Sequence, residues 1–161
     1  MLPGADFPAT RQCEEGNPLF WSSLERYRDH GLLVLRVGFG LGLLWYHGWD
    51  KLVGGPERWA QVGGAMELVG IGFAPAFWGF LAALAESVGG VLSALGFLFR
   101  PAALAIAFVM VMATVQHMVT GQGTPAHSFK NIWVFVGLLA IGPGRFSVDR
   151  YLSERRKGKE V

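Results

Sequence analysis

The chain alternates long apolar runs with short polar or glycine-rich segments, and this pattern predicts its helices. Four runs are apolar enough to be transmembrane helices, and they cover residues 30–49, 75–99, 101–119 and 126–141. The first run is long enough to cross a hydrocarbon layer about 30 Å thick, because a helix rises about 1.5 Å per residue. The fourth run is short. The pattern therefore predicts an all-α fold, an integral membrane four-helix bundle.

The segment between the first two predicted spans has a different pattern. Over residues 57–72, apolar side chains recur on one helical face, at Trp59, Val62, Met66 and Val69. The segment also contains three charged residues and is interrupted by Gly63-Gly64. It therefore predicts a short interfacial or re-entrant segment that caps the bundle and does not span the membrane.

The same pattern divides the chain into three regions. Residues 1–29 contain no apolar core, which excludes a secretory signal and predicts a cytoplasmic N-terminal arm. Within this arm, Asn17-Pro18 precedes aromatic residues at helical spacing, so an interfacial helix and an unstructured tail both stay open. Residues 30–144 form the predicted bundle, and residues 145–161 form a basic cytoplasmic tail.

Composition supports the membrane assignment. Of 161 residues, 52% are hydrophobic and 16% are charged, a lower charged fraction than the usual quarter or so of soluble domains. Glycine, present 23 times, is common in membrane helices because it lets backbones approach closely. The single cysteine, Cys13, excludes an internal disulfide and a C-x-x-C redox pair. Redox chemistry would therefore need a cofactor, a quinone or a partner protein.

The distribution of lysine and arginine predicts the orientation of the four spans. The two terminal regions and the turn between the second and third spans carry ten of these residues, whereas the other two loops carry three. Basic residues concentrate on the cytoplasmic side of membrane proteins. We therefore expect both termini to be cytoplasmic.

Arg36 lies inside the first predicted span, where a charged side chain costs roughly 2.5 to 3.5 kcal/mol unless it is paired or near water. If the first two spans are antiparallel neighbours, Glu86 lies at a matching depth. We therefore expect Arg36 and Glu86 to form a buried ion pair. Such a pair could have a purely structural role, in which it holds two helices together. It could also form a proton or ligand site.

Five basic side chains lie at the non-cytoplasmic ends of the predicted spans: His47, Lys51, His117, His127 and Lys130. If these helix ends converge, the side chains border one electropositive pocket, suited to a quinone or a small acidic substrate. Ordinary polarity at helix ends is the alternative. No H-x-x-H or E-x-x-H pair occurs on a predicted helix, so no metal site is assigned.

Four short motifs together resemble the DoxX family of small bacterial membrane proteins. In chain order they are Leu35-Arg36, His47-Gly48-x-x-Lys51, Ala85-Glu86-x-x-Gly89-Gly90 and Gly142-Pro-Gly-Arg-Phe-Ser-Val-Asp-Arg150. The resemblance extends from about Leu35 to Leu152 and leaves the first 34 residues uncovered. The family typically has Tyr-Ser-Leu-Asp in the last motif, so Phe146 and Val148 are departures from its pattern.

The resemblance implies a multi-pass protein of the bacterial inner membrane. Members of the family include membrane subunits of quinone-linked oxidoreductases, so a quinone is the cofactor that the resemblance suggests. More distant relatives are transport or assembly factors and binders of lipophilic ligands. The first hypothesis is therefore a DoxX-like membrane subunit of a quinone-linked redox system. The sequence leaves open whether the chain is itself catalytic.

Two other hypotheses have different partners. One is a non-catalytic accessory or assembly subunit, which would dock on a membrane protein through its basic tail and the Gly38-x-x-x-Gly42 face. The other is a binder of a lipid or a lipophilic small molecule. Membrane lipids are partners under every hypothesis. The basic tail is too short and too poor in aromatic residues to indicate a nucleic acid partner.

Overall fold

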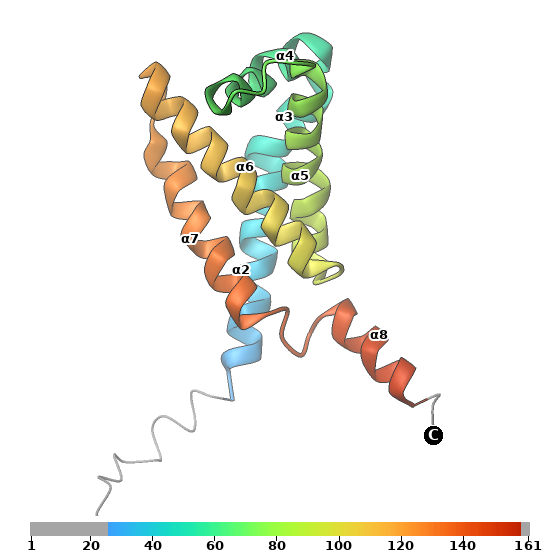
Figure 1. Ribbon diagram of the computed structural model, residues 1–161. Helices are drawn as coiled ribbons and strands as arrows, with labels where there is room; N and C mark the ends of the chain where they lie inside the picture. Colours follow the sequence, from blue (N-terminus) through green and yellow to red (C-terminus); the bar gives the residue numbers. More distant parts are fainter. Residues whose placement is uncertain (1–25, 159–161) are drawn as a thin grey trace, which may run out of the picture.

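The computed structural model describes residues 26–158, which form helices joined by short loops (Figure 1). Three helical segments are long and apolar enough to cross a membrane: Arg28–Val53, Pro75–Leu95 and Phe99–Thr120. A further helix of 17 residues, α7 (Pro125–Ile141), packs along the third segment. The predicted all-α membrane bundle is confirmed. The interfacial helix considered within residues 1–29 lies outside the described residues.

The first span is built from three consecutive pieces. They are α2 (Arg28–Leu43), the π-helical turn η1 (Leu44–Gly48) and α3 (Trp49–Val53). Along α2 the buried residues are Leu32, Arg36, Gly40 and Leu43, which is the inward-facing stripe that helical spacing requires. The π turn contains His47, and such turns often occur at functional sites because they redirect side chains.

Glycine contacts set the register between the first span and α5 (Pro75–Leu95). A Cβ atom on Gly40 would lie 2.4 Å from the carbonyl oxygen of Gly90. A Cβ atom on Gly48 would lie 2.7 Å from the backbone nitrogen of Ser87. The two backbones therefore touch at these points, which only glycine permits. As a result, Gly48 lies beside Ser87 and its neighbour Glu86.

The predicted Arg36–Glu86 ion pair is wrong. Glu86 pairs with Lys51, whose ammonium nitrogen lies 2.6 Å from a carboxylate oxygen of Glu86. The expected matching depth requires the outer ends of the two predicted spans, Trp49 and Pro75, to lie level. Pro75 instead packs against Gly63 of α4, beyond the end of the first span. Because Gly48 is the residue next to Glu86, and Arg36 precedes Gly48 by 12 positions, Arg36 lies about 18 Å away along the helix.

A cap covers one end of the bundle, formed by α4 (Gly55–Gly63) and the 3₁₀ helix η2 (Gly64–Val69) (Figure 1). Glycine again allows contact, because a Cβ atom on Gly79 would lie 1.8 Å from the carbonyl oxygen of Trp59. This cap is the short segment between the first two spans that the sequence predicts over residues 57–72.

The turn between α5 and α6 (Phe99–Thr120) lies earlier than predicted. The predicted spans 75–99 and 101–119 place the turn at residue 100, but Arg100 and Pro101 both belong to the first turn of α6. Proline is tolerated there because the first N–H groups of a helix have no intrahelical partner. The core of the bundle joins α2, α6 and α7 through Leu32, Leu43, Phe99, Ala103, Ile106, Ala107, Met110, Phe135 and Leu138.

The predicted C-terminal tail contains another helix, α8 (Val148–Lys157), fastened to the base of the bundle. Both carboxylate oxygens of Asp149 accept hydrogen bonds from backbone nitrogens at the start of α6, those of Leu98 at 2.9 Å and Phe99 at 3.0 Å. The buried Arg36 donates to the carbonyl oxygen of Phe146. Arg36 therefore belongs to the junction between the bundle and α8.

Candidate functional site

A cavity of about 400 Å³ lies at the capped end of the bundle, bounded by α4, η2, α5 and α6. Its walls are mainly apolar and include Met66, Trp78, Leu81, Phe108 and Met112. Polar side chains from α3, α4, α6 and the loop after α6 also line it, namely Lys51, Arg58, Gln61, Gln116, His117, Thr120 and Gln122. A largely apolar cavity with a few polar groups is the usual form of a small-molecule site, and its volume falls within the usual range of about 300 to 1,000 Å³.

Small side chains on both long helices create this space. Alanines line it at Ala82 and Ala85 in α5 and at Ala105 and Ala113 in α6. On the side of the cap, a Cβ atom on Gly63 would lie 1.8 Å from the carbonyl oxygen of Pro75, so α4 is pressed against α5. Close packing at the cap and alanines below it therefore leave room between α5 and α6.

Lys51 connects the cavity with a buried carboxylate. Its ammonium nitrogen lies 2.7 Å from Oε1 and 2.6 Å from Oε2 of Glu86. The Glu86 side chain is 1% exposed, whereas that of Lys51 is 18% exposed and lines the cavity. A buried carboxylate without a partner would lower the stability of the fold, so the charge of Glu86 has to be compensated by Lys51. The ammonium group of Lys51, paired with Glu86, therefore lies at the cavity wall.

His47 and His127 contact each other on the side of α7. Their Nε2 atoms are 2.9 Å apart, and their ring centroids are 4.8 Å apart. One Nε2 atom must donate a hydrogen and the other must accept it, so at least one of the two rings is neutral in this arrangement. His47 is half-buried in η1, and His127 is exposed on α7. The contact joins the first span to the beginning of α7.

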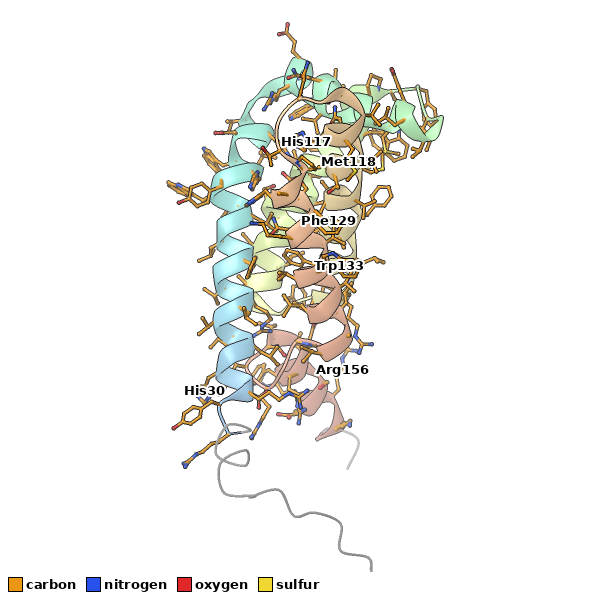
Figure 2. The ribbon with its side chains drawn as sticks, turned by 90° about the vertical axis from the view of Figure 1, so that its left-hand side faces the viewer. His30, His117, Met118, Phe129, Trp133 and Arg156 are labelled. Atoms are coloured by element: carbon orange, nitrogen blue, oxygen red, sulfur yellow. The ribbon has the colours of Figure 1, made fainter. Side chains whose placement is uncertain are left out.

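His117 lies at the end of α6 beside the loop that leads to α7 (Figure 2). Its Nδ1 atom is 2.6 Å from the carbonyl oxygen of Gln122, which can only accept, so Nδ1 carries the hydrogen. This leaves Nε2 available for another partner. Because His117 also lines the cavity, a ligand atom there is one such partner.

Four of the five predicted site residues are thus divided between two places. Lys51 and His117 line the cavity, whereas His47 and His127 form a separate pair that is not among its lining residues. Lys130 is exposed on α7 and lines neither the cavity nor the histidine pair. The role of all five in binding a ligand stays a prediction.

The sequence reasoning missed two polar residues of the cap. Arg58 donates a hydrogen bond to Gln61 at 2.8 Å, and both side chains line the cavity. Their spacing of three residues on the amphipathic segment 57–72 places them on one helical face, a signal that was available in the sequence. Within residues 26–158, no group of three or more His, Cys, Asp or Glu side chains is placed to hold a metal ion.

Comparison with known proteins gives two matches. The sequence profile of the DoxX family matches residues 31–119, which include the first span, the cap, α5 and nearly all of α6. Inner membrane protein YqjF of Escherichia coli (strain K12) is 34% identical over 137 residues, which cover 82% of this chain and 99% of that protein. No solved structure matches the chain.

Proposed function

The chain belongs to the DoxX family, and on that premise we propose that it is a membrane subunit that binds a quinone for a redox system. The observation that carries this proposal is the cavity between the cap, α5 and α6. It combines apolar walls with hydrogen-bond donors, the two features that a quinone ring with an apolar tail requires. The inner bacterial membrane, where the similar Escherichia coli protein resides, also contains the quinone pool that such a subunit would use.

The cavity residues fit a quinone chemically. Lys51 and Gln116 are donors suited to the ring oxygens, and Trp78 and Phe108 offer aromatic faces. The free Nε2 atom of His117 accepts from a hydroxyl group when the ring is neutral and donates to a carbonyl when the ring is protonated. His117 therefore suits both the reduced and the oxidised form of the ligand.

A bound quinone supplies the transfer of two electrons and two protons. The chain itself would bind and orient the ring, exclude water through the apolar walls and exchange protons through His117. The electrons would pass to or from a partner redox protein. This division makes the chain a subunit of a larger system and leaves the substrate chemistry to the partner.

A second candidate function is that of an accessory subunit, and one observation favours it. On α2, Cβ atoms added to Gly38 and Gly42 would meet nothing within 4 Å, so this glycine face does not contact the described bundle. The exposed side chains around it are apolar and include Val34, Leu41 and Trp45. Such a face suits close packing against a helix of another membrane protein.

Copurification tests these two functions together. We would purify the protein in mild detergent, extract bound lipophilic molecules and identify them by mass spectrometry. Ala82→Phe places a ring in the cavity, and Val88→Phe on the exposed side of α5 is the matched control. The proposal predicts quinone with the wild type and the control, and at least tenfold less with Ala82→Phe.

The other outcomes contradict the quinone assignment. Equal amounts of quinone in all three preparations would show that it binds in the detergent micelle. A different lipophilic molecule that is lost with Ala82→Phe would identify the chain as a binder of that molecule. Copurifying proteins without any bound lipophilic molecule would favour the accessory subunit.

A further inference from the structure

A second cavity, of about 650 Å³, lies at the end of the bundle away from the cap. It is formed where α2 and α6 begin, where α7 ends and where α8 packs against them. Four arginines line it, namely Arg28, Arg100, Arg145 and Arg150. We propose that this arginine pocket binds the phosphate headgroup of an anionic phospholipid.

The carboxylates in the arginine pocket are already engaged by backbone groups. Asp149 accepts from two N–H groups at the start of α6, and Asp29 accepts from the backbone nitrogen of Arg145 at 3.1 Å. Arg150 donates to Glu154 at 2.7 Å. Within residues 26–158, the side chains of the other three arginines form no salt bridge. They are therefore free to bind a phosphate, which matches the donors of a guanidinium group.

Part of the lining is apolar, which favours a lipid over free phosphate. Leu98 and Ile141 line the pocket and are 52% and 50% exposed. Both lie at ends of helices in the bundle, so the pocket wall continues onto the surface that faces the acyl chains. A free phosphate ion would gain nothing from this apolar wall, whereas a phospholipid would bury part of its glycerol and acyl groups there.

The position of α8 places the pocket at the level of the headgroups. Val148, Tyr151 and Leu152 are exposed on α8, beside the basic residues Arg155, Arg156 and Lys157. This combination is typical of a helix that lies in the membrane interface. Figure 2 shows Arg156 and His30 at the same end of the molecule, far from His117 at the opposite end. A basic pocket at this level is the kind of site that binds acidic lipid headgroups.

Native mass spectrometry of the full chain in mild detergent tests the site, with phosphatidylglycerol and phosphatidylethanolamine as probes. In the variant Arg100→Gln/Arg145→Gln, two pocket guanidinium groups are removed, while the hydrogen bond from the Arg145 backbone to Asp29 stays. Arg155→Gln/Arg156→Gln is the control, because it removes the same charge from α8 outside the pocket. We expect affinity for phosphatidylglycerol to fall roughly 30-fold in the pocket variant, which loses guanidinium–phosphate hydrogen bonds, and less than about threefold in the control.

Three outcomes would overturn the proposal. One is an equal loss in both variants, which would indicate general attraction to a basic surface. Another is a wild-type protein that binds the two lipids equally. The third is displacement of phosphatidylglycerol by millimolar inorganic phosphate, which would identify free phosphate as the ligand.

A measurement on the wild type alone covers the case in which the pocket variant does not fold. Bound phosphatidylglycerol should slow hydrogen exchange over residues 141–153, which contribute the end of α7 and the start of α8 to the pocket. Phosphatidylethanolamine should leave this exchange unchanged. The same exchange with both lipids would contradict the proposed site.

Discussion

The ammonium nitrogen of Lys51 lies 2.7 and 2.6 Å from the two carboxylate oxygens of Glu86, and this pair joins the end of the first span to the middle of α5. Glu86 is fully enclosed, whereas Lys51 reaches the cavity wall. The pair therefore has a structural role in the helix interface and, under the proposed function, Lys51 supplies a hydrogen-bond donor to the quinone site.

The Lys51–Glu86 pair should behave as a unit in stability measurements. Lys51→Met alone leaves a buried carboxylate without a partner and should cost about 3 to 5 kcal/mol. The double variant Lys51→Met/Glu86→Leu should be milder, because both charges are removed. Thermal unfolding in detergent would measure both effects. The exposed pair on α8 is the control, and Glu154→Gln should change the melting temperature little. A double variant that is less stable than Lys51→Met alone would contradict the pairing.

The close contact between α2 and α5 predicts different effects for glycines on the same helix. Gly40→Ala brings a methyl group within 2.4 Å of the carbonyl oxygen of Gly90, so the helices must separate, at a cost of about 1 to 3 kcal/mol. Gly38→Ala adds a methyl group with nothing within 4 Å and should leave the purified protein equally or slightly more stable. Equal melting temperatures for the two variants would show that the register described here is incorrect.

The contact between His47 and His127 should be lost in acid. It needs one neutral ring as acceptor, so protonation of both rings replaces a hydrogen bond with repulsion between like charges. Its contribution to stability is therefore present at higher pH and lost as the pH falls. Near neutral pH, hydrogen exchange over residues 126–131 should be slower in the wild type than in His47→Ala. This difference should vanish in acid, and its persistence there would count against the shared hydrogen bond.

The orientation of the spans is predicted from ten basic residues on one side against three on the other. In a Cys13→Ser background, single cysteines at Gln61 on the cap and at Ser153 on α8 report the two sides. A membrane-impermeant thiol reagent added to intact cells should label the position on the cap and leave the position on α8 unlabelled. The reverse labelling pattern would place both termini outside the cytoplasm.

The sequence predicts the spans because each is a long apolar run, but it does not predict their register. Close contacts at Gly40, Gly48 and Gly79 determine the position of α5 along the first span and the cap. The sequence has 23 glycines and does not show which of them make such contacts. In the observed register Glu86 lies beside Lys51, with which it pairs, and not beside Arg36. Distances counted along separate helices are reliable only after such contacts are known.

The end of the chain shows a second limit. Ser147 and Asp149 belong to the family motif that the sequence displays. Ser147 accepts a hydrogen bond from the nearby backbone nitrogen of Arg150, whereas the hydrogen bonds of Asp149 cross to a distant part of the chain. Asp149 caps α6 from about 50 residues away in the sequence, and no local pattern reveals this contact. The candidate site also depends on contacts between distant parts of the chain. Lys51 and His117 were identified by type, but only the packing of α4, α5 and α6 shows which histidine lines the cavity.

Photoaffinity labelling with a photoreactive quinone analogue tests the central claim most directly. The purified protein would be irradiated with the analogue, digested and mapped by mass spectrometry. Labels should lie on the cavity residues of α5 and α6, within 78–85 and 105–117, and should fall at least tenfold in Ala82→Phe but not in Val88→Phe. Labels confined to exposed lipid-facing residues, or unchanged by Ala82→Phe, would contradict a quinone site in this cavity.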